Sequence, residues 1–302
     1  MEFIGKTRID FIGKRNISFI VSAIISLIGI IGIVQIARGT ANMGIDFSGG
    51  TAVQLKFARP VSLEQARSAM ARHNVKDVNL QEIKEGNKLL IKVGKTSLAV
   101  GKAADTIEEV FKKEFADNSF VVESSTEIGP SIGDKLRKDT LVAVAISMLG
   151  IIIYIAWRFD FKFGIAAAIA TLHDVMAIFA AFYVLNKEVN LLLITAVLTI
   201  AGYSLTDTVV VFDRIRENLH KNLKEPIAKI FNQSINEVLS RTIITSLTTF
   251  LAASSLFFFG GEVIHDFAFA LVVGVAVGTY SSIFVASPIV VVWENRGRKA
   301  QA

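Results

Sequence analysis

The stretch GYSLTDTVVVFDRIREN, from Gly202 to Asn218, begins inside an apolar run and ends in a cluster of charged residues. Asp207 lies before that cluster and is followed by a row of apolar side chains. A charge at the centre of a bilayer costs about 3 kcal/mol on insertion scales, and such residues face the interior of a helix bundle and mark functional pathways. The stretch therefore predicts a membrane protein with a functional acid, provided that the surrounding chain spans a membrane.

The composition supports a membrane protein. The chain has 302 residues, of which 52% are hydrophobic, and its mean hydropathy of +0.52 is high for a soluble domain. A helix needs about 20 residues to cross a hydrocarbon core of about 30 Å, and lipid offers no partners for the backbone polar groups of irregular structure. We expect six spanning helices, over Ile17–Ile36, Leu141–Ala156, Gly164–Leu185, Val189–Phe212, Thr242–Phe259 and Phe267–Val292.

Basic residues predict the orientation of these helices. They precede the first apolar run and follow the second, fourth and sixth, and flanks rich in Lys and Arg stay in the cytoplasm. We therefore expect both termini to be cytoplasmic. The predicted segments are a cytoplasmic N-terminus (1–16), a first transmembrane helix (17–36), a periplasmic or external α+β domain (37–139), five further helices (140–292) with a cytoplasmic connector (213–240), and a cytoplasmic C-terminus (293–302).

Composition also excludes several classes of protein. The net charge of +5 is explained by the basic flanks, and no basic stripe on a soluble surface indicates a nucleic-acid partner. The first apolar run is longer than a signal-peptide core and no clear small-residue cleavage site follows it, so we expect an uncleaved anchor. The chain contains no cysteine, which excludes disulfides and thiolate metal sites. We expect no metal site.

The segment between the first two spanning helices has the pattern of a small α+β domain. Ser62 followed by Gln65 is typical of a capping box at a helix start. The element order β-α-β-β-α-β predicts a ferredoxin-like split βαβ module. Its elements are strand Thr51–Phe57, helix Ser62–His73, strands Asp77–Ile83 and Lys88–Val93, helix Ala99–Phe115 and strand Ser119–Ser124.

The sequence MGIDFSGG, from Met43 to Gly50, connects the first helix to this module. A phosphate-binding loop follows a strand and opens a helix, whereas this segment follows a helix and opens a strand. We favour a tight turn in which Asp46 and Ser48 bond to nearby backbone. The alternative is a docking or signature role for the residues Gly44, Asp46, Gly49 and Gly50.

Polar residues within the apolar runs give the candidate site. Asp207 and Arg241 are expected at similar depth towards the cytoplasm, because the fourth helix runs inward and the fifth outward. An aspartate beside a guanidinium can ionise, and protonation would break the pair, which is what a proton relay requires. His173–Asp174 in the third helix is interpreted as a structural pair. Supporting polar residues are Tyr203, Thr206, Thr245 and Thr248.

Tyr203 and Asp207 lie four residues apart and so share one helix stripe. We expect this stripe to face a partner or a shared centre. Small residues at 202, 274 and 278 predict close helix contacts. The connector over 213–240 has an amphipathic pattern, which predicts a helix on the membrane surface that is broken at Pro226.

Three motifs together carry a resemblance to a known family. The Gly202–Asn218 stretch, SRTIITSLTT over Ser240–Thr249 and GIDFSGG over 44–50 resemble the SecF family of the bacterial SecD–SecF protein-export complex, within the resistance–nodulation–division superfamily. The family's membrane acid matches Asp207 and its arginine matches Arg241.

The resemblance implies a fold and a function. The chain would be half of a twelve-helix transporter, paired with SecD in the bacterial cytoplasmic (inner) membrane. It would use the proton gradient to promote export of unfolded preproteins, together with SecA, the SecY–SecE–SecG channel and YajC. Protons would be the coupling ion, with no other cofactor and no enzymatic active site.

Two other classes of function remain open from the residues. One is an intramembrane aspartyl protease that uses Asp174 and Asp207, since paired carboxylates perform acid–base chemistry. Such proteases carry a Gly-x-Gly-Asp motif, whereas Ser204, Leu205 and Thr206 precede the acid here. The other is a non-catalytic membrane assembly factor in which the polar residues only pack helices.

Overall fold

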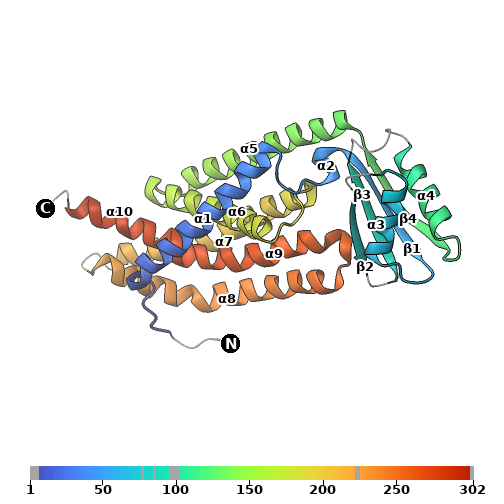
Figure 1. The fold of residues 1–302 in the computed structure, drawn as a ribbon. Coiled ribbons are helices and arrows are strands. Elements are labelled where there is room, and N and C mark those ends of the chain that lie inside the picture. Colours follow the sequence, from blue (N-terminus) through green and yellow to red (C-terminus); the bar gives the residue numbers. More distant parts are fainter. Residues whose placement is uncertain (1–6, 76–77, 84–85, 95–101, 222–224, 300–302) are drawn as a thin grey trace. The chain divides into compact units, whose positions relative to one another are not determined.

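The computed structural model describes residues 7–75, 78–83, 86–94, 102–221 and 225–299. The chain forms two compact units (Figure 1). The helical unit comprises Met1–Asn42 and Ala143–Ala302, and the α+β unit comprises Met43–Val142.

The helical unit confirms the six spanning helices, because six helices among the described residues are long and apolar enough to cross a membrane. The helix α9 continues through a π turn, η2, into α10, and these three elements form one span. The elements are η1 (Ile12–Lys14), α1 (Arg15–Arg38), α5 (Pro130–Arg158), α6 (Phe161–Val184), α7 (Leu191–Lys221), α8 (Ile227–Phe259), α9 (Glu262–Ser281), η2 (Ser282–Ala286) and α10 (Ser287–Lys299).

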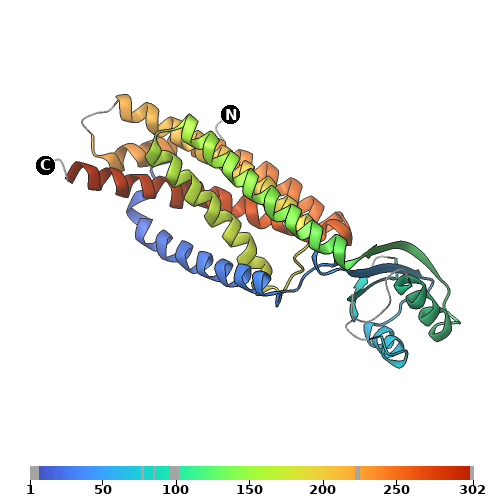
Figure 2. The same ribbon diagram turned by 90° about the horizontal axis from the view of Figure 1, so that it is seen from above.

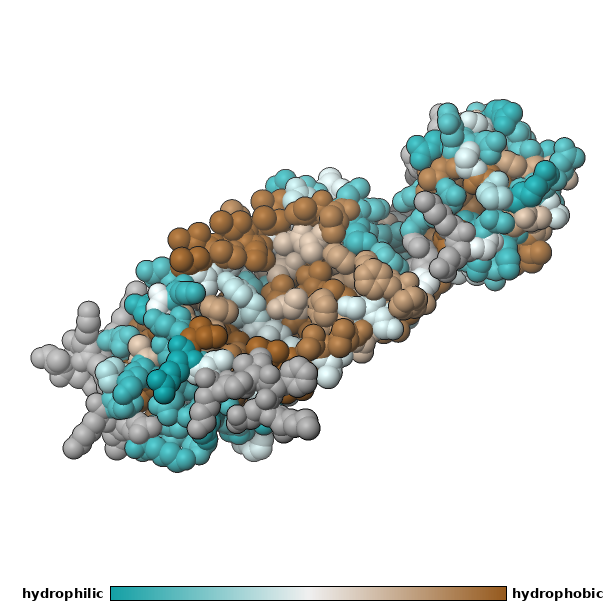
Figure 3. Space-filling model, turned by 90° about the horizontal axis from the view of Figure 1, so that it is seen from below, coloured by the Kyte–Doolittle hydropathy of each residue, from teal (hydrophilic) through white to brown (hydrophobic). Residues whose placement is uncertain are grey.

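The six spans are buried to different degrees. In α6, α7 and the α9–α10 span, about half of the residues in the most apolar stretch are buried. In α5 only 6% of that stretch is buried, and in α8 only 17%. Helix α1 packs on α6, and α9 packs on α6, α7 and α8. Figure 2 shows α1 (blue) and α8 (orange) on opposite sides of this bundle. On the face shown in Figure 3, hydrophobic side chains gather over the middle of the helical unit, and hydrophilic ones at one end. Such an apolar band suits contact with lipid or with further helices.

The prediction of a separate surface helix in the connector is wrong. Helix α7 runs without a break to Lys221, and α8 begins at Ile227 after Pro226. The polar ends of the two helices pack against each other instead. Arg214 Nε donates to Glu237 at 2.6 Å, and Asn218 Nδ2 donates to Ser234 at 3.0 Å. The amphipathic pattern reflects this pairing of helix ends.

The α+β unit confirms the split βαβ module. Its sheet has the order β2-β3-β1-β4, with every neighbouring pair antiparallel. The Ser62–Gln65 capping box is present. Asp77 and residues 99–101, which the prediction included, lie outside the described residues. The elements are α2 (Ile45–Ser48), β1 (Gly50–Phe57), α3 (Leu63–Arg72), β2 (Val78–Ile83), β3 (Lys88–Gly94), α4 (Ala103–Glu114) and β4 (Phe120–Ile128).

The core of the module lies between one face of the sheet and the helices α3 and α4. Alternate residues of β1 and β3 are buried there, as the period of two in a half-covered sheet requires. The aromatic ring of Phe111 in α4 is fully buried, 5.9 Å from that of Phe57. The sheet residues of this core are Val53, Leu55, Phe57, Leu89, Ile91 and Val93.

The segment Gly44–Gly50 forms a one-turn helix, α2, followed by two glycines with positive φ. Ser48 Oγ lies 2.9 Å from the carbonyl oxygen of Gly44 and 3.0 Å from that of Gly49, which agrees with local backbone bonding. Gly50 has φ +140°, and a Cβ there would lie 2.4 Å from the carbonyl oxygen of Val93. Only glycine fits this position without strain.

Gly50→Ala should therefore destabilise the α+β unit by about 2 kcal/mol or more, since strained backbone and a clash combine. Gly94→Ala is a matched control, because Gly94 pairs with Gly50 across the sheet and a Cβ there meets nothing within 4 Å. Hydrogen exchange of β1 and β3 in the full chain measures the effect. Equal protection in the two variants would contradict this account of the turn.

Glu123 in β4 makes the α+β unit sensitive to acid. Its carboxylate accepts from Lys88 Nζ at 2.8 Å and from Gln54 Nε2 at 2.8 Å, and the bond from Lys88 contributes most to lowering the pKa of Glu123. A carboxyl with a lowered folded-state pKa stabilises the fold above its ordinary pKa, and that contribution is lost as the pH falls through the folded-state value.

Thermal unfolding of the α+β unit should thus shift to lower temperature as the pH falls below the ordinary range of a glutamate. Glu123→Gln should reduce this shift and leave the rest of the acid response in place. The effect is small because the side chains are partly exposed to solvent. An identical pH profile for the wild type and Glu123→Gln would show that the carboxylate is not involved.

Candidate intramembrane acid site

Asp207 is buried where three helices meet. Its side chain on α7 is 4% exposed. Asp207 Oδ2 accepts from Ser246 Oγ on α8 at 3.1 Å, and Ser246 Oγ accepts from Thr279 Oγ1 on α9 at 2.7 Å. A short chain of hydroxyl groups therefore joins the acid to both neighbouring helices. Buried polar groups require such partners.

Two glycines bring α9 close enough to α7 for this arrangement. A Cβ at Gly274 would lie 2.6 Å from the Ile200 side chain, and one at Gly278 would lie 3.0 Å from Cβ of Ser204. The small-residue contact predicted for 274 and 278 is confirmed. Gly202 is exposed, and a Cβ added there would meet nothing within 4 Å among the described residues, so its close contact is not made within this chain and stays a prediction.

Arg241 lies on the exposed side of α8. Among the described residues no ion pair within 4.0 Å joins it to Asp207, so the predicted pair is not formed in this structure. Its charge still acts electrostatically on the Asp207 carboxyl. The two residues therefore lie in one region of the unit without contact.

The supporting residues predicted from the sequence lie away from the acid. Thr206, Thr245 and Thr248 are exposed, and each hydroxyl donates to a backbone carbonyl of its own helix. Tyr203 is half-buried, and its hydroxyl has no hydrogen-bond partner among the described residues. The three threonines mark a face of α7 and α8 that other described helices of this chain leave uncovered.

The hydroxyl partners of the acids were missed by sequence reasoning. These small polar residues look like ordinary helix-packing positions. The available signal was the spacing of Ser204 from Thr208 and of Thr279 from Ser282, which places each pair on one helix face. They are Ser204, Thr208, Ser246, Thr279, Ser281 and Ser282.

His173 and Asp174 form a second polar cluster on α6. Asp174 is fully buried. Its Oδ1 lies 3.1 Å from His173 Nδ1, and its Oδ2 accepts from Ser281 Oγ at 2.8 Å and from Ser204 Oγ. The hydroxyl groups of Thr208 and Ser282 lie 2.9 Å apart beside it. No hydrogen bond joins Asp174 to Asp207 among the described residues, and each carboxyl accepts from its own serine hydroxyls.

A buried apolar cluster packs the helical unit on both sides of Asp207 along α7. The side chains of Phe212 and Phe231 are fully buried there, as is Ile12 of the N-terminal segment. Asn232 Oδ1 accepts from the backbone N–H groups of Phe11 and Ile12 at 2.9 and 3.0 Å, which holds this segment against α8. Next to Phe212 in the chain, Asp213 accepts from Arg158 Nη2 with both carboxylate oxygens, at 2.9 and 2.8 Å.

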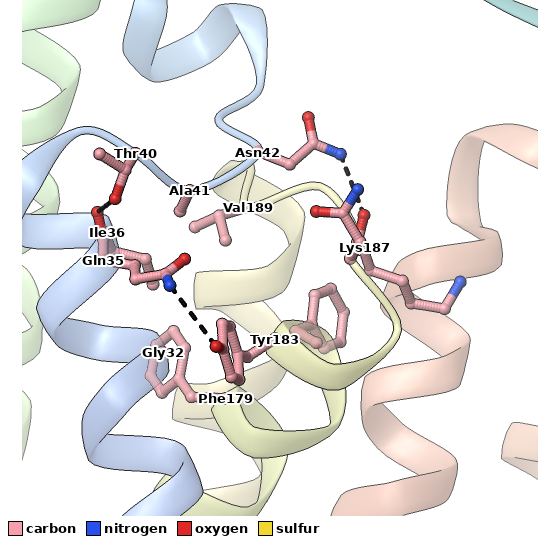
Figure 4. Close-up of a pocket in the computed structure, with 12 residues that line it drawn as sticks. Gly32, Gln35, Ile36, Thr40, Ala41, Asn42, Phe179, Tyr183, Lys187 and Val189 are labelled. Atoms are coloured by element: carbon pink, nitrogen blue, oxygen red, sulfur yellow. Dashed lines mark hydrogen bonds between the residues drawn. The ribbon is translucent and has the colours of Figure 1, made fainter.

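A pocket lies at the other end of the helical unit (Figure 4). It is lined by side chains of α1 and the residues directly after it, of α6 and of the α6–α7 connection, among them the amide groups of Gln35, Asn42 and Asn186 and the aromatic rings of α6. Asn42 Nδ2 donates to the carbonyl of Asn186, and Val189 N donates to the carbonyl of Asn42. Asp207 follows Val189 by 18 residues, about 27 Å along a helix. The pocket is therefore separate from the acid site.

No group of three or more His, Asp or Glu side chains placed to bind a metal ion is found in the part of the chain that the structure describes. The side chains gathered around the two acids are carboxyl, imidazole and hydroxyl groups.

Six spanning helices, buried acids between them and a split βαβ unit define a multi-pass membrane protein with an α+β domain. Residues 106–296 match the family described as protein export membrane protein SecD/SecF, C-terminal, and residues 41–61 match the SecD/SecF GG motif. The second match contains the Gly44–Gly50 segment.

Individual relatives agree with the family match. The chain is 52% identical over 292 residues to the protein translocase subunit SecF of Thermodesulfovibrio yellowstonii, covering 96% of each chain. It is 42% identical to that of Calditerrivibrio nitroreducens, covering 95% of this chain and 94% of the relative. This protein belongs to the SecD/SecF family of protein-export membrane proteins.

Solved structures show the same fold. The crystal structure of SecDF from Thermus thermophilus, described as a translocon-associated membrane protein, matches with a TM-score of 0.83 and 37% identity. The match covers 96% of this chain but only 39% of that longer chain. A super-membrane-facing form of SecDF matches with a TM-score of 0.70 and 37% identity, covering 99% of this chain and 40% of the other.

Proposed function

We propose that this chain is the SecF-type subunit of a bacterial protein-export translocase and couples the proton gradient to preprotein export together with SecD. The similarity to SecF subunits over almost the whole chain supports this role. The SecDF chain, of which this chain covers 39%, is a precedent for a transporter that contains a second half in addition to the part matched here. In this proposal SecD is a separate chain that completes the transporter.

The observation that carries the proposal is the burial of Asp207 among hydroxyl groups at the junction of three helices. A neutral, protonated carboxyl is tolerated in an apolar interior, whereas an ionised one requires a compensating charge. Arg241 is the nearby cation on the adjacent helix. In the proposed cycle, Asp207 binds a proton in the state described here and, after losing it, pairs with Arg241.

The pairing requires helix motion, because Arg241 and Asp207 are not in contact here. A rotation or slide of α8 against α7 would exchange Ser246 for Arg241 as the partner of the acid. In this proposal the buried side chains of Phe212 and Phe231 keep water from reaching Asp207 from the charged end in this state. If Asp207 were accessible from each side of the membrane in turn, protons would cross the membrane through this site down their gradient.

The exposed polar face of α7 and α8 supports SecD as the partner. Polar side chains are costly against lipid, so a face with Thr206, Thr245 and Thr248 is better covered by protein than by hydrocarbon. Gly202 on the same face permits the close approach of another helix. We place the interface with SecD here.

The orientation follows from the basic flanks. The N-terminal segment, the α5–α6 connection and the end of α7 lie at one end of the unit, where Asn232 holds Phe11 and Arg158 pairs with Asp213. We place this end in the cytoplasm and the α+β unit outside the inner membrane. SecA, the SecY–SecE–SecG channel, YajC and the unfolded preprotein are the proposed partners.

The rival functions gain no support. An aspartyl protease requires two acids at one site, whereas Asp174 and Asp207 bond to different hydroxyl groups. A passive assembly factor gives no reason for two separate buried acids in the membrane.

Reconstitution tests the proposal. Vesicles that contain SecD, the SecY–SecE–SecG channel and SecA should export a preprotein faster under a proton gradient when this chain is present. Without the chain the gradient should have a much smaller effect. An equal response to the gradient with and without the chain would refute the proposed function.

A further inference from the structure

The His173–Asp174 cluster lacks a basic side chain. Among the described residues the only ion-pair partner of Asp174 is the neighbouring imidazole, at 3.1 Å. His173 is 5% exposed and Asp174 is 0% exposed. A carboxylate beside a neutral imidazole would leave one net negative charge in the middle of the bundle, where an uncompensated charge costs several kcal/mol.

One additional proton removes that charge. With the proton on His173 the pair is an imidazolium and a carboxylate, and with the proton on Asp174 it is a neutral imidazole and a carboxylic acid. Both forms have zero net charge, and the contact between His173 Nδ1 and Asp174 Oδ1 lets the two groups share the proton as one coupled site.

One ring nitrogen of His173 is available to bind this proton. His173 Nε2 is buried and has no hydrogen-bond partner among the described residues. The ring of Tyr280 lies 6.1 Å from the imidazole ring, and the Tyr280 hydroxyl contacts Ser22 Oγ at 3.2 Å on α1. The titratable groups that face His173 are thus Asp174 on its own helix and Tyr280 on α9, whereas α1 and α7 contribute serine hydroxyls.

The pair also holds the two helices that form the Asp207 site. Ser204 lies three residues before Asp207 on α7, and Ser281 lies two residues after Thr279 on α9. Directly after Ser281 the helix widens into the π turn η2, where Ser287 Oγ donates to the carbonyl of Ser282. Such π turns recur at functional sites because they locally change helix register.

We propose that the His173–Asp174 pair is a second proton-binding site, which holds one proton in this state and transmits its loss to α7 and α9 through Ser204 and Ser281. Loss of the proton to water leaves the pair with one negative charge. The two serine hydroxyls then become the main stabilising donors, so the positions of α7 and α9 depend on the proton. This second site rests on the proposed function for its role in export. The test of proton binding is independent of that function.

Spectroscopy of the full chain with SecD in lipid bilayers tests proton binding directly. The chain has four histidines, so nitrogen-15 spectra of labelled histidine are simple, and His173→Asn assigns the signal. Infrared spectra report the carboxylic acid of Asp174, assigned with Asp174→Asn. We expect one of the two protonated signatures at low pH and its complete loss at high pH.

Two results would overturn the site. A neutral His173 beside an ionised Asp174 at every pH would show a hydrogen-bonded structural pair. A protonated signature that persists at every pH would show a proton that is never released. Neither result depends on export activity, so failure here is distinguishable from failure of the proposed function.

A matched pair of variants tests the link to export. The double variant His173→Asn with Asp174→Asn keeps amide groups that can hydrogen-bond to each other but has no group that binds the proton. It should reduce gradient-driven export by about 10²-fold, as for loss of a positioned proton-transfer group. His265→Asn is the control, because His265 also lies beside an aspartate, Asp266, which Lys187 neutralises at 2.6 Å. Equal export in both variants would overturn the transmitted role.

Discussion

Asp207→Asn should abolish the stimulation of export by the proton gradient while the chain still assembles with SecD. Asparagine has the shape of aspartate and can still accept a hydrogen bond from Ser246 Oγ, which lies 3.1 Å from the carboxyl in the native chain. It cannot bind or release a proton. Loss of a proton-transfer group reduces a rate by about 10²-fold or more, so gradient-driven export should fall to the basal rate.

Asp213→Asn is the matched control for this experiment. Asp213 lies on the same helix, about one and a half turns further on, and pairs with Arg158. Its side chain is 44% exposed, and exposed ion pairs contribute about 0–1 kcal/mol. Export by this variant should remain close to wild type. Persistence of gradient-driven export in Asp207→Asn would remove Asp207 from the coupling mechanism.

Gly29→Val should detach α1 from the bundle. A Cβ at Gly29 would lie 2.2 Å from the backbone carbonyl oxygen of Met176 on α6, and a backbone atom cannot move aside as a flexible side chain can. Overpacking costs about 1–3 kcal/mol or more, and close contacts between membrane helices depend on small residues. The variant should lose most of its folded population on mild heating in detergent.

Gly150→Val on α5 separates this clash from a general effect of valine in a membrane helix. Gly150 is exposed, and a Cβ there meets nothing within 4 Å. Thermal aggregation of the two purified variants, measured side by side, should leave Gly150→Val close to wild type. Similar melting of Gly29→Val and wild type would show that α1 is not packed on α6 through Gly29.

The sequence pattern predicted the elements well because each carries a strong periodic signal. The apolar runs are long enough to span a bilayer. The alternation in β1 and β3 and the Ser62–Gln65 capping box mark the α+β module. The prediction of a surface helix over 213–240 failed because an amphipathic pattern does not show which surface the apolar face of the helix contacts. Here the end of α7 and the start of α8 pack against each other rather than on a membrane surface.

The partner of Asp207 was not predictable from depth alone. Flanking charges and helix direction place Asp207 and Arg241 at similar depth, but they do not fix rotation about the helix axis. Ser246 and Arg241 are five residues apart, which corresponds to about 140° around a helix. Ser246 faces the acid, and Arg241 therefore faces outward in this state.

Reaction of Asp207 with a hydrophobic carbodiimide, measured by mass spectrometry during export, tests the central claim most directly. Carbodiimides modify protonated carboxyl groups, so the extent of labelling reports whether the acid carries its proton. The account predicts that labelling of Asp207 changes when the proton gradient is collapsed, while labelling of Asp213 stays constant. Equal labelling of Asp207 with and without the gradient, during active export, would contradict it.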